Sequence, residues 1–149
     1  MRKYTRILTL IAAFFAITAN QTTFGQTPHE KLANAQESLR VAEASYGIGH
    51  FGTVAALQGV ALAYSELKDK RCLETLNKID AILDNYAENA HQWRSRPKQI
   101  EMLYYYETED RKKSAQKLKE LVDIILISDF TDEGKVQYML ETAVLVSIF

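Results

Sequence analysis

Residues 54–83, VAALQGVALAYSELKDKRCLETLNKIDAIL, decide the fold of this chain. Their first half is apolar at helical spacing, and Gln58 is the one polar side chain between Val54 and Tyr64. In the second half, apolar residues recur in alternating steps of four and three, which places them on one face of a helix: Cys72, Leu76, Ile79 and Leu83. The charged residues 68–70 interrupt both patterns. The stretch therefore predicts two helices joined by a short turn.

Another helix is predicted before this hairpin. Thr27 is a capping residue, Pro28 suits the first helical position, and Glu30 completes a capping box three residues after Thr27. Gly47 and Gly49 suit the helix end, because glycine tolerates the left-handed conformation at which helices often end. We expect a helix over residues 28–46, and we interpret the glycine-rich link that follows it as a flexible joint.

Helical periodicity continues after the hairpin, in segments separated by polar stretches. We expect the hairpin's second helix to reach about Ala90, a joint over 91–97 because Pro97 disfavours helix at the preceding residue, and a bend in the polar run 107–113. A turn at 128–131 precedes the last helix. The segments carry apolar residues at Ile100, Leu103 and Tyr104, at Ala115, Leu118, Val122 and Ile125, and at Val136, Met139, Leu140, Ala143 and Val144.

The fold class predicted is all-α, with five or six helices as consecutive antiparallel α-hairpins, either stacked or closed as a bundle. Residues 143–149 lose the helical period and are β-branched enough for a strand. The all-helical context favours helix there.

A weak repeat supports the hairpin arrangement. Residues 63–83 and 105–126 align at an offset of about 42 residues, and each has a tyrosine at the end of one helix, a charged turn with Asp, and a second helix closing on Asp-x-Ile-Leu or Asp-Ile-Ile-Leu. One hairpin cannot bury its apolar face alone, so such units stack on their neighbours.

This pattern resembles a degenerate tetratricopeptide repeat over about half of the chain. Lys68-Asp69 stands where that family usually has Gly-Asp, while the closing proline is absent and the period exceeds the usual 34 residues. The large, large, small and aromatic positions of the family's first helix are matched by Leu57, Val60, Ala61 and Tyr64. The resemblance implies a concave groove that holds an extended or helical peptide of another protein.

The first 25 residues have the composition of a secretory signal peptide. A basic start precedes an apolar run at 7–17 that is too short to span a bilayer comfortably. Small residues at 23 and 25 provide a cleavage site, and Ala19 ends a second one. We expect removal of residues 1–25 and a single domain, 26–149, that works in the periplasm or outside the cell.

Composition excludes several classes of protein for this domain. All 19 acidic residues follow the leader while some of the 18 basic ones precede the cleavage site, so cleavage makes the net charge of −1 more negative. Nucleic acid is therefore an unexpected partner, because it requires a concentrated positive field. No apolar run long enough for a membrane span follows the leader. Cys72 is the one cysteine, so no intramolecular disulfide forms.

Catalytic and metal-binding patterns are not found in the sequence. His29, His50 and His91 are scattered and form no His-Glu-x-x-His motif, so we expect neither a metal nor a cofactor. The run 47–52 lacks the strand and the Gly-Lys-Ser/Thr ending of a phosphate loop. Cys72 lies on an apolar seam, and we expect a buried, unreactive thiol. The chain is predicted not to be an enzyme.

Two short segments provide candidate binding residues. Trp93 with Arg94 and Arg96 could bind an anionic group, or the indole could cover a helix end beside solvated arginines. Three successive tyrosines, Tyr104, Tyr105 and Tyr106, span about 200° of a helix, so at least one should be exposed, although tyrosine also caps cores with its ring inside. Exposed tyrosine is enriched where proteins meet.

We therefore expect an exported, non-catalytic module that binds another protein or peptide through these six residues. A second hypothesis is an immunity or inhibitor protein that neutralises a toxin or enzyme in the same compartment, since blocking needs shape and charge without catalysis. A third is an exported helical ligand or cofactor binder, which the ligand spacing does not favour.

Overall fold

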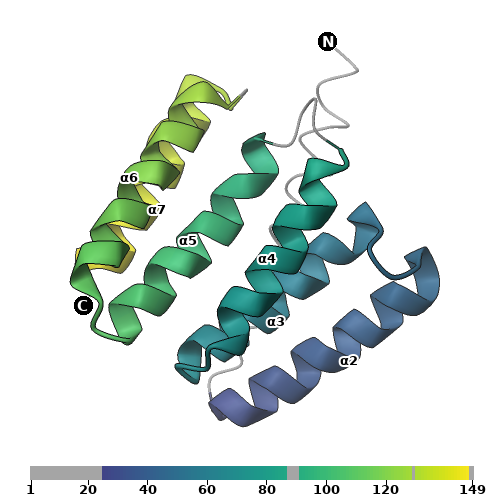
Figure 1. Ribbon diagram of the computed structural model, residues 1–149. Helices are drawn as coiled ribbons and strands as arrows, with labels where there is room; N and C mark the ends of the chain where they lie inside the picture. Colours follow the sequence, from purple (N-terminus) through teal and green to yellow (C-terminus); the bar gives the residue numbers. More distant parts are fainter. Residues whose placement is uncertain (1–24, 87–90, 129, 148–149) are drawn as a thin grey trace.

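The computed structural model describes residues 25–86, 91–128 and 130–147 (Figure 1). These residues form six α-helices and one short 3-10 helix, without a strand, so the predicted all-α class is confirmed. Apart from Gly25, the predicted signal peptide lies outside the described residues. With the labels of Figure 1, the elements are α2 (Pro28–Tyr46), η1 (Phe51–Thr53), α3 (Val54–Glu66), α4 (Arg71–Asp84), α5 (His91–Glu107), α6 (Arg111–Ile127) and α7 (Asp132–Ser147).

Helix α2 begins and ends where the sequence predicts. The Thr27 hydroxyl accepts a hydrogen bond from the Glu30 amide at 3.3 Å, and the Glu30 carboxylate accepts one from the Thr27 amide at 2.7 Å. This reciprocal pair satisfies two amides at a helix start, where carbonyl partners are missing. At the other end Gly47 has a φ of 91°, which glycine adopts readily, and the chain leaves the helix there.

The core lies between α3, α4 and α5. Helix α3 buries residues around most of its circumference, because its small residues let α2, α4 and α5 pack on it. Helix α4 buries the single face that its four-three spacing predicts. The buried apolar residues with at most 1% exposure in these helices are Val54, Ala61, Cys72, Ile79, Leu83 and Ile100. The stretch that predicts the hairpin thus also supplies most of the core.

The helices pack as two successive hairpins with a helix added at each end. α3 and α4 form the first hairpin, α5 and α6 form the second, and α5 lies against both helices of the first (Figure 1). α2 packs on α3, and α7 packs on α6, behind it in the view of Figure 1. Helices α4 and α6 therefore flank α5.

The two hairpin turns have the same backbone hydrogen bonds. In each turn an aspartate amide donates to the carbonyl of a tyrosine five residues earlier, at 2.9 Å: Asp69 to Tyr64, and Asp110 to Tyr105. The residue before each aspartate has a positive φ, 55° at Lys68 and 64° at Glu109. This is a helix ending in which one residue adopts the left-handed conformation that favours glycine. The two stretches that align in the sequence therefore share a turn geometry.

Most of the remaining boundaries agree with the sequence. Helix α3 begins at Val54, the polar run 107–113 contains the break between α5 and α6, and α7 extends as helix to Ser147. Helix α4 ends at Asp84, earlier than the predicted end near Ala90. The last four residues of that prediction, and residues 148–149, lie outside the described part of the chain.

The joint predicted over residues 91–97 is wrong, because these residues form the first two turns of α5. Pro97 disfavours the helical conformation at the preceding residue, which is the reason the sequence favoured a joint, and its nitrogen cannot donate a helical hydrogen bond. Tertiary contacts overcome this cost. The Trp93 ring meets Phe51 edge-on, with ring centroids 5.0 Å apart, and Arg94 forms ion pairs with α4.

Candidate functional site

The six residues proposed from the sequence lie at two ends of α5. Trp93, Arg94 and Arg96 lie in its first two turns, and Tyr104–Tyr106 lie at the end of the helix. At a rise of about 1.5 Å per residue, Trp93 and Tyr104 are about 16 Å apart along the axis. They therefore form two separate groups rather than one surface.

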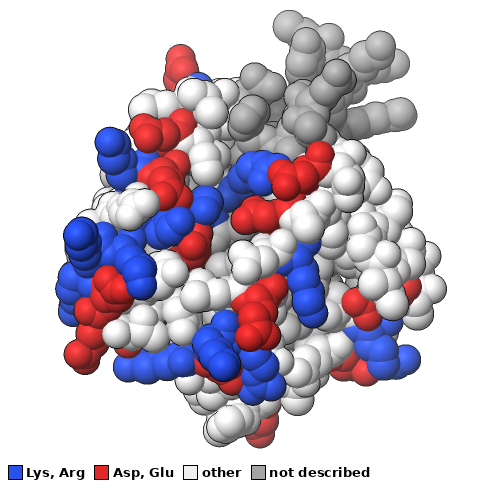
Figure 2. All heavy atoms as spheres, viewed as in Figure 1, with Lys and Arg blue, Asp and Glu red and all other residues white. Residues whose placement is uncertain are grey.

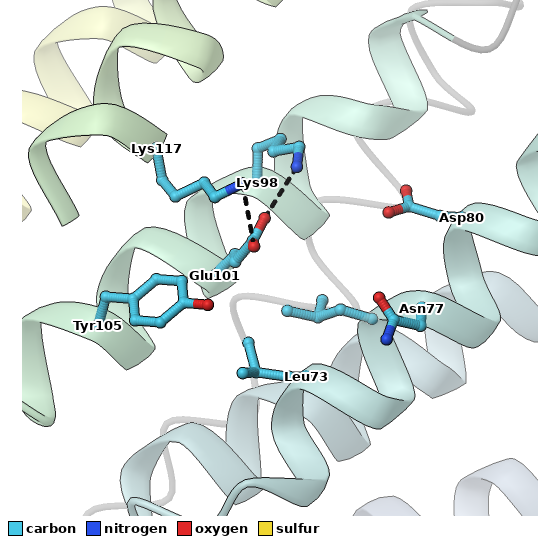
Figure 3. Close-up of a pocket in the computed structure, with 8 residues that line it drawn as sticks. Leu73, Asn77, Asp80, Lys98, Glu101, Tyr105 and Lys117 are labelled. Atoms are coloured by element: carbon cyan, nitrogen blue, oxygen red, sulfur yellow. Dashed lines mark hydrogen bonds and ion pairs between the residues drawn. The ribbon is translucent and has the colours of Figure 1, made fainter. Parts of the chain in front are cut away.

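Between α4 and α6, over α5, the surface has a hollow of about 330 Å³ (Figure 3). This volume is at the lower end of the range for ligand-binding pockets. The hollow is lined by Leu73, Leu76, Asn77, Asp80, Lys98, Glu101, Tyr105 and Lys117. Tyr105 is the one residue of the sequence prediction among them.

The exposed lining of the hollow is mostly polar, and its smaller apolar part lies at the Leu73 and Tyr105 end. Leu73, Asn77 and Asp80 are spaced by four and three residues, so they lie along one face of α4. In Figure 3 the Tyr105 ring projects from α5 near Leu73, while Asp80 and Lys98 lie toward the other end. A bound group would meet an apolar wall first and charges about two helical turns further on.

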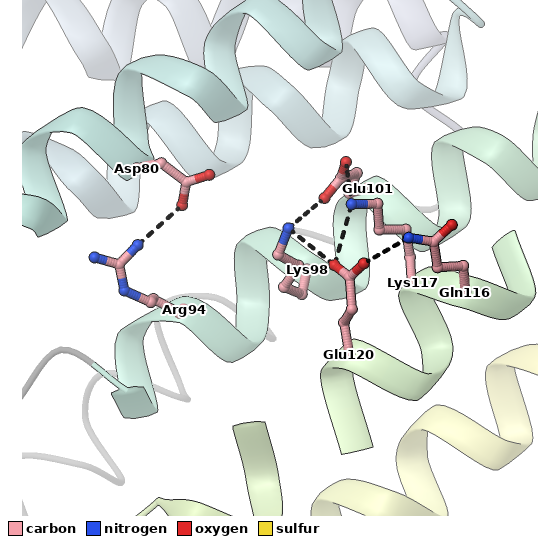
Figure 4. Close-up of polar contacts among 7 residues, drawn as sticks. All are labelled: Asp80, Arg94, Lys98, Glu101, Gln116, Lys117 and Glu120. Atoms are coloured by element: carbon pink, nitrogen blue, oxygen red, sulfur yellow. Dashed lines mark hydrogen bonds and ion pairs between the residues drawn. The ribbon is translucent and has the colours of Figure 1, made fainter. Parts of the chain in front are cut away.

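Two lysines and two glutamates form a closed network on the α5–α6 side (Figure 4). Lys98 Nζ lies 2.8 Å from Glu101 and 3.3 Å from Glu120, and Lys117 Nζ lies 3.2 Å from Glu101 and 3.1 Å from Glu120. The second oxygen of Glu120 accepts a hydrogen bond from Gln116 at 3.1 Å. The network holds α5 and α6 together and neutralises both lysines.

Ion pairing within this partly buried network shifts the pKa of two of its members. Burial disfavours the charge on Lys117, but its hydrogen bonds to Glu120 and Glu101 outweigh burial and raise the pKa of Lys117. Burial likewise opposes the charge on Glu120, and the neighbouring lysines outweigh it and lower the pKa of Glu120. Both groups are therefore held in their charged forms near neutral pH.

Asp80 lies at the edge of the hollow with a weaker partner. Arg94 Nη1 is 3.4 Å from Asp80 Oδ1 (Figure 4), while Arg94 Nη2 is 2.5 Å from Asp84 Oδ1. Burial raises the pKa of Asp80; Lys98 and Arg94 oppose this rise, and the negative charges of Glu101 and Asp84 add to it. The carboxylate of Asp80 is thus less well compensated than the glutamates of the network.

The tyrosine triplet turns most of its surface inward. Tyr104 is 8% exposed, and Tyr105 and Tyr106 are half-buried, so the expected exposed tyrosine is found only in part. The rings of Tyr104 and Tyr105 meet edge-on with centroids 5.6 Å apart. Basic groups of α6 cover two of the rings: Arg111 lies 4.1 Å from the centroid of Tyr106, and Lys113 lies 5.1 Å from that of Tyr105.

The Trp93 end of α5 carries a second aromatic group. Phe51 packs between Trp93 and Tyr86, with ring centroids 5.0 Å and 5.4 Å away, and His50 stacks on Tyr46 at 5.8 Å. Tyr46 and Tyr86 are 58% and 45% exposed, more than any tyrosine of the triplet. Neither of these two rings is among the binding residues proposed from the sequence. The Arg96 guanidinium donates a hydrogen bond to the side-chain oxygen of Gln99 on the same helix.

The joint between α2 and α3 is a hydrogen-bonded turn. The Nδ1 atom of His50 accepts a hydrogen bond from the Gly52 amide at 3.0 Å and caps η1. Gly52 lies so close to Tyr46 that a methyl group there would be 2.7 Å from the ring. Packing of this ring therefore requires glycine at position 52.

The predicted burial of Cys72 is confirmed. Its side chain is 0% exposed, and burial, with smaller contributions from Glu101 and Asp69, raises its pKa to about 12. The thiol stays protonated near neutral pH, and the thiolate is the nucleophilic form. Among the described residues no group of three or more His, Cys, Asp or Glu side chains is placed to hold a metal ion.

Sequence reasoning missed most of the hollow. Two of its pairs, Lys98 with Glu101 and Lys117 with Glu120, are spaced by three residues, which could have placed each pair on one helix face. Nothing in the sequence shows that the two pairs face each other across α5 and α6.

The surface around the hollow has mixed charge. Figure 2 shows Lys and Arg side chains interspersed with Asp and Glu over the face that α4, α5 and α6 form, without one large area of a single sign. In the described ranges no helix has the length and apolar character needed to cross a bilayer. Comparison with protein-family models, with curated proteins and with solved structures finds no match to this chain.

Proposed function

We propose that this chain is an exported, non-catalytic module that binds another protein, and that the hollow between α4 and α6 is its contact surface. The observation that carries the proposal is the hollow itself, which joins an apolar wall at Leu73 and Tyr105 to charged side chains. Interfaces that combine an apolar centre with a polar rim are typical of protein recognition.

The predicted leader supports the exported part of the proposal. The capping box at Thr27 starts just after the predicted cleavage site, so cleavage after Gly25 leaves the first helix intact. Amino-terminal sequencing of the protein from its native compartment should give Gln26 as the first residue. Recovery of the full-length chain in the cytoplasm would contradict export.

The paired hairpins support a further part of the proposal, that α3–α4 and α5–α6 are a degenerate tetratricopeptide-like repeat. The supporting features are the shared turn geometry and the packing of α5 on both helices of the first hairpin. Lys68 and Glu109 have left-handed backbones, and each directly precedes the aspartate of its turn. The tetratricopeptide family usually has Gly-Asp at these two positions of the turn.

The contact surface is tested by filling the hollow. Asn77 is exposed and lines it, so Asn77→Trp should block access without disturbing the core. Lys119→Trp is the matched control, because Lys119 is exposed and lies about 200° around α6 from Lys117. Each variant, immobilised, is compared with the unchanged protein for the proteins it retains from the native compartment.

We expect Asn77→Trp to lose at least one protein that Lys119→Trp and the unchanged chain both retain. Identical retained proteins for all three would reject the hollow as the contact surface. If the lost protein is an enzyme whose activity falls when this chain is added, the module acts as an inhibitor.

A further inference from the structure

The charges around the hollow are unequally satisfied, and this inequality points to the chemistry of its occupant. Lys98 and Lys117 each contact both Glu101 and Glu120, at 2.8 to 3.3 Å. An anionic guest would have to compete with two carboxylates for these ammonium groups. The hollow therefore disfavours acidic side chains.

The opposite charge is available at Asp80. Arg94 is shared between Asp80 and Asp84, and the shorter contact is with Asp84, which lies one helical turn further along α4. Like charges at this spacing repel each other, and one guanidinium is divided between the two. Lys98 also acts on Asp80, but its ammonium group is paired with Glu101 and Glu120. A second cation beside Asp80 would relieve this excess of negative charge.

The wall of the hollow suits the stem of such a cation. Leu76 precedes Asp80 by four residues on α4 and presents only a small part of its surface, 4%, to the hollow. The Tyr105 ring lies near Leu73 (Figure 3). Long basic side chains bury their aliphatic stems on apolar surface and keep the charged end near water or a carboxylate. Asp80 lies at the polar end of this wall, with 40% of its side chain exposed.

We propose that the hollow takes an arginine or lysine side chain of the partner protein, with the cation beside Asp80 and the stem over Leu76. The inference rests on the proposed function and names the partner's chemistry at that site. The partner is thus a protein that presents a basic side chain next to an apolar one, and the latter lies on Leu73 and Tyr105.

The test is an NMR titration of the purified protein with N-acetyl-arginine amide, followed through the backbone amides. N-acetyl-citrulline amide is the matched probe, since it has the same shape without the charge. We expect saturable shifts at Leu73, Asn77 and Asp80 with the arginine probe, and binding weaker by about tenfold or more with citrulline, because a charge-assisted hydrogen bond is lost.

Two variants isolate the carboxylate. Asp80→Asn should remove the preference for arginine. Asp84→Asn frees Arg94 to pair fully with Asp80, so it should weaken the preference without removing it. Melting curves of both variants check that they fold. Burial raises the pKa of Asp80, so its ionised form adds nothing to folding and Asp80→Asn should melt at the same temperature or higher.

Equal binding of the two probes, absence of saturable shifts, or a preference for arginine that survives unchanged in Asp80→Asn would overturn the inference. Each of these results leaves the proposed function standing if Asn77→Trp still loses a partner that Lys119→Trp retains. Conversely, the arginine probe could bind more tightly than the citrulline probe while Asn77→Trp and Lys119→Trp retain the same proteins. That result would show a cation site at Asp80 and would reject the hollow as a contact surface for proteins.

Discussion

The central helices and the carboxyl-terminal helices use their apolar residues in opposite ways. Helices α3, α4 and α5 enclose a continuous cluster in which Ile79, Leu83 and Cys72 have no exposed surface. Helix α6 buries Leu121 and Ile125, but four other large apolar residues of α6 and α7 are more than half exposed, at 55 to 63%: Leu126, Ile127, Val136 and Leu140. Among the residues of α7 whose side chains the structure describes, Thr142 alone is buried.

This difference shows that helical periodicity identifies an apolar face of a helix but does not indicate whether another helix covers that face. Helix α3 has neighbours on several sides, whereas, within the described part of the chain, the substantial helix contacts of α7 are with α6. The two regions should therefore differ in stability, in local opening and in their response to substitution.

The largest expected effect is the loss of a core side chain. Ile79→Ala should lower the free energy of unfolding by about 2 to 5 kcal/mol, because it leaves a cavity that the surrounding core side chains can fill only in part. Leu140→Ala, at a position 61% exposed, should change it by less than about 0.5 kcal/mol. Chemical denaturation followed by circular dichroism measures both. A large cost at Leu140 would mean that another surface covers α7.

Hydrogen exchange should sharpen the same comparison. Amides of α4 should exchange only through nearly global unfolding, while amides of α7 should open with a free energy lower by about 2 kcal/mol or more, because few buried contacts hold that helix. Equal protection of the two helices, measured residue by residue, would contradict the difference in packing.

The hairpin turns provide a smaller effect of opposite sign. Lys68 has a φ of 55°, and relief of this strain in Lys68→Gly should raise the free energy of unfolding by about 1 kcal/mol. Glu109→Gly should act similarly in the second turn, at a φ of 64°. Lys70→Gly is the control, since Lys70 has a φ of −58°. Glycine there should leave the free energy of unfolding unchanged or lower it. A gain at Lys70 equal to that at Lys68 would reject strain as the cause.

The smallest effect concerns the pH dependence of stability at the hollow. Because burial raises the pKa of Asp80, the folded state holds that proton more tightly, and the ionised carboxylate lowers stability near neutral pH. Asp80→Asn should remove this penalty at pH 7 and have little effect below the pKa. Arg94, Lys98 and Glu101 on α5, Asp84 on α4, and Lys117 and Glu120 on α6 are the charged groups around it. A lower melting temperature of Asp80→Asn at pH 7 would show that Asp80 stabilises the fold.

Much of the fold could be predicted from short-range patterns in the sequence. The capping box at Thr27 fixed the start of α2, and the four-three spacing around Ile79 fixed the buried face of α4. Interactions within one helix or one turn determine both features, so no knowledge of distant residues was needed.

The rest depended on contacts between distant residues. Pro97 argues locally for a break, yet α5 begins at His91 because Trp93 packs on Phe51, more than 40 residues earlier. The hollow likewise depends on how α4 and α6 flank α5. The sequence marks Asp80 as the aspartate of the Asp-x-Ile-Leu ending, but this pattern does not show that Asp80 faces a hollow. Tyr105 was identified because three adjacent tyrosines cannot all face one core.

Photo-crosslinking in cells of the source organism would decide whether the hollow is a contact surface. A photoreactive phenylalanine derivative is placed at position 77, within the hollow, and in a second strain at position 119, on the opposite side of α6. The protein is expected to form a discrete crosslinked species from position 77, and this species should weaken when Asp80→Asn is added. Crosslinking from position 119 alone, or with equal yield and the same product from both positions, would contradict the proposed surface.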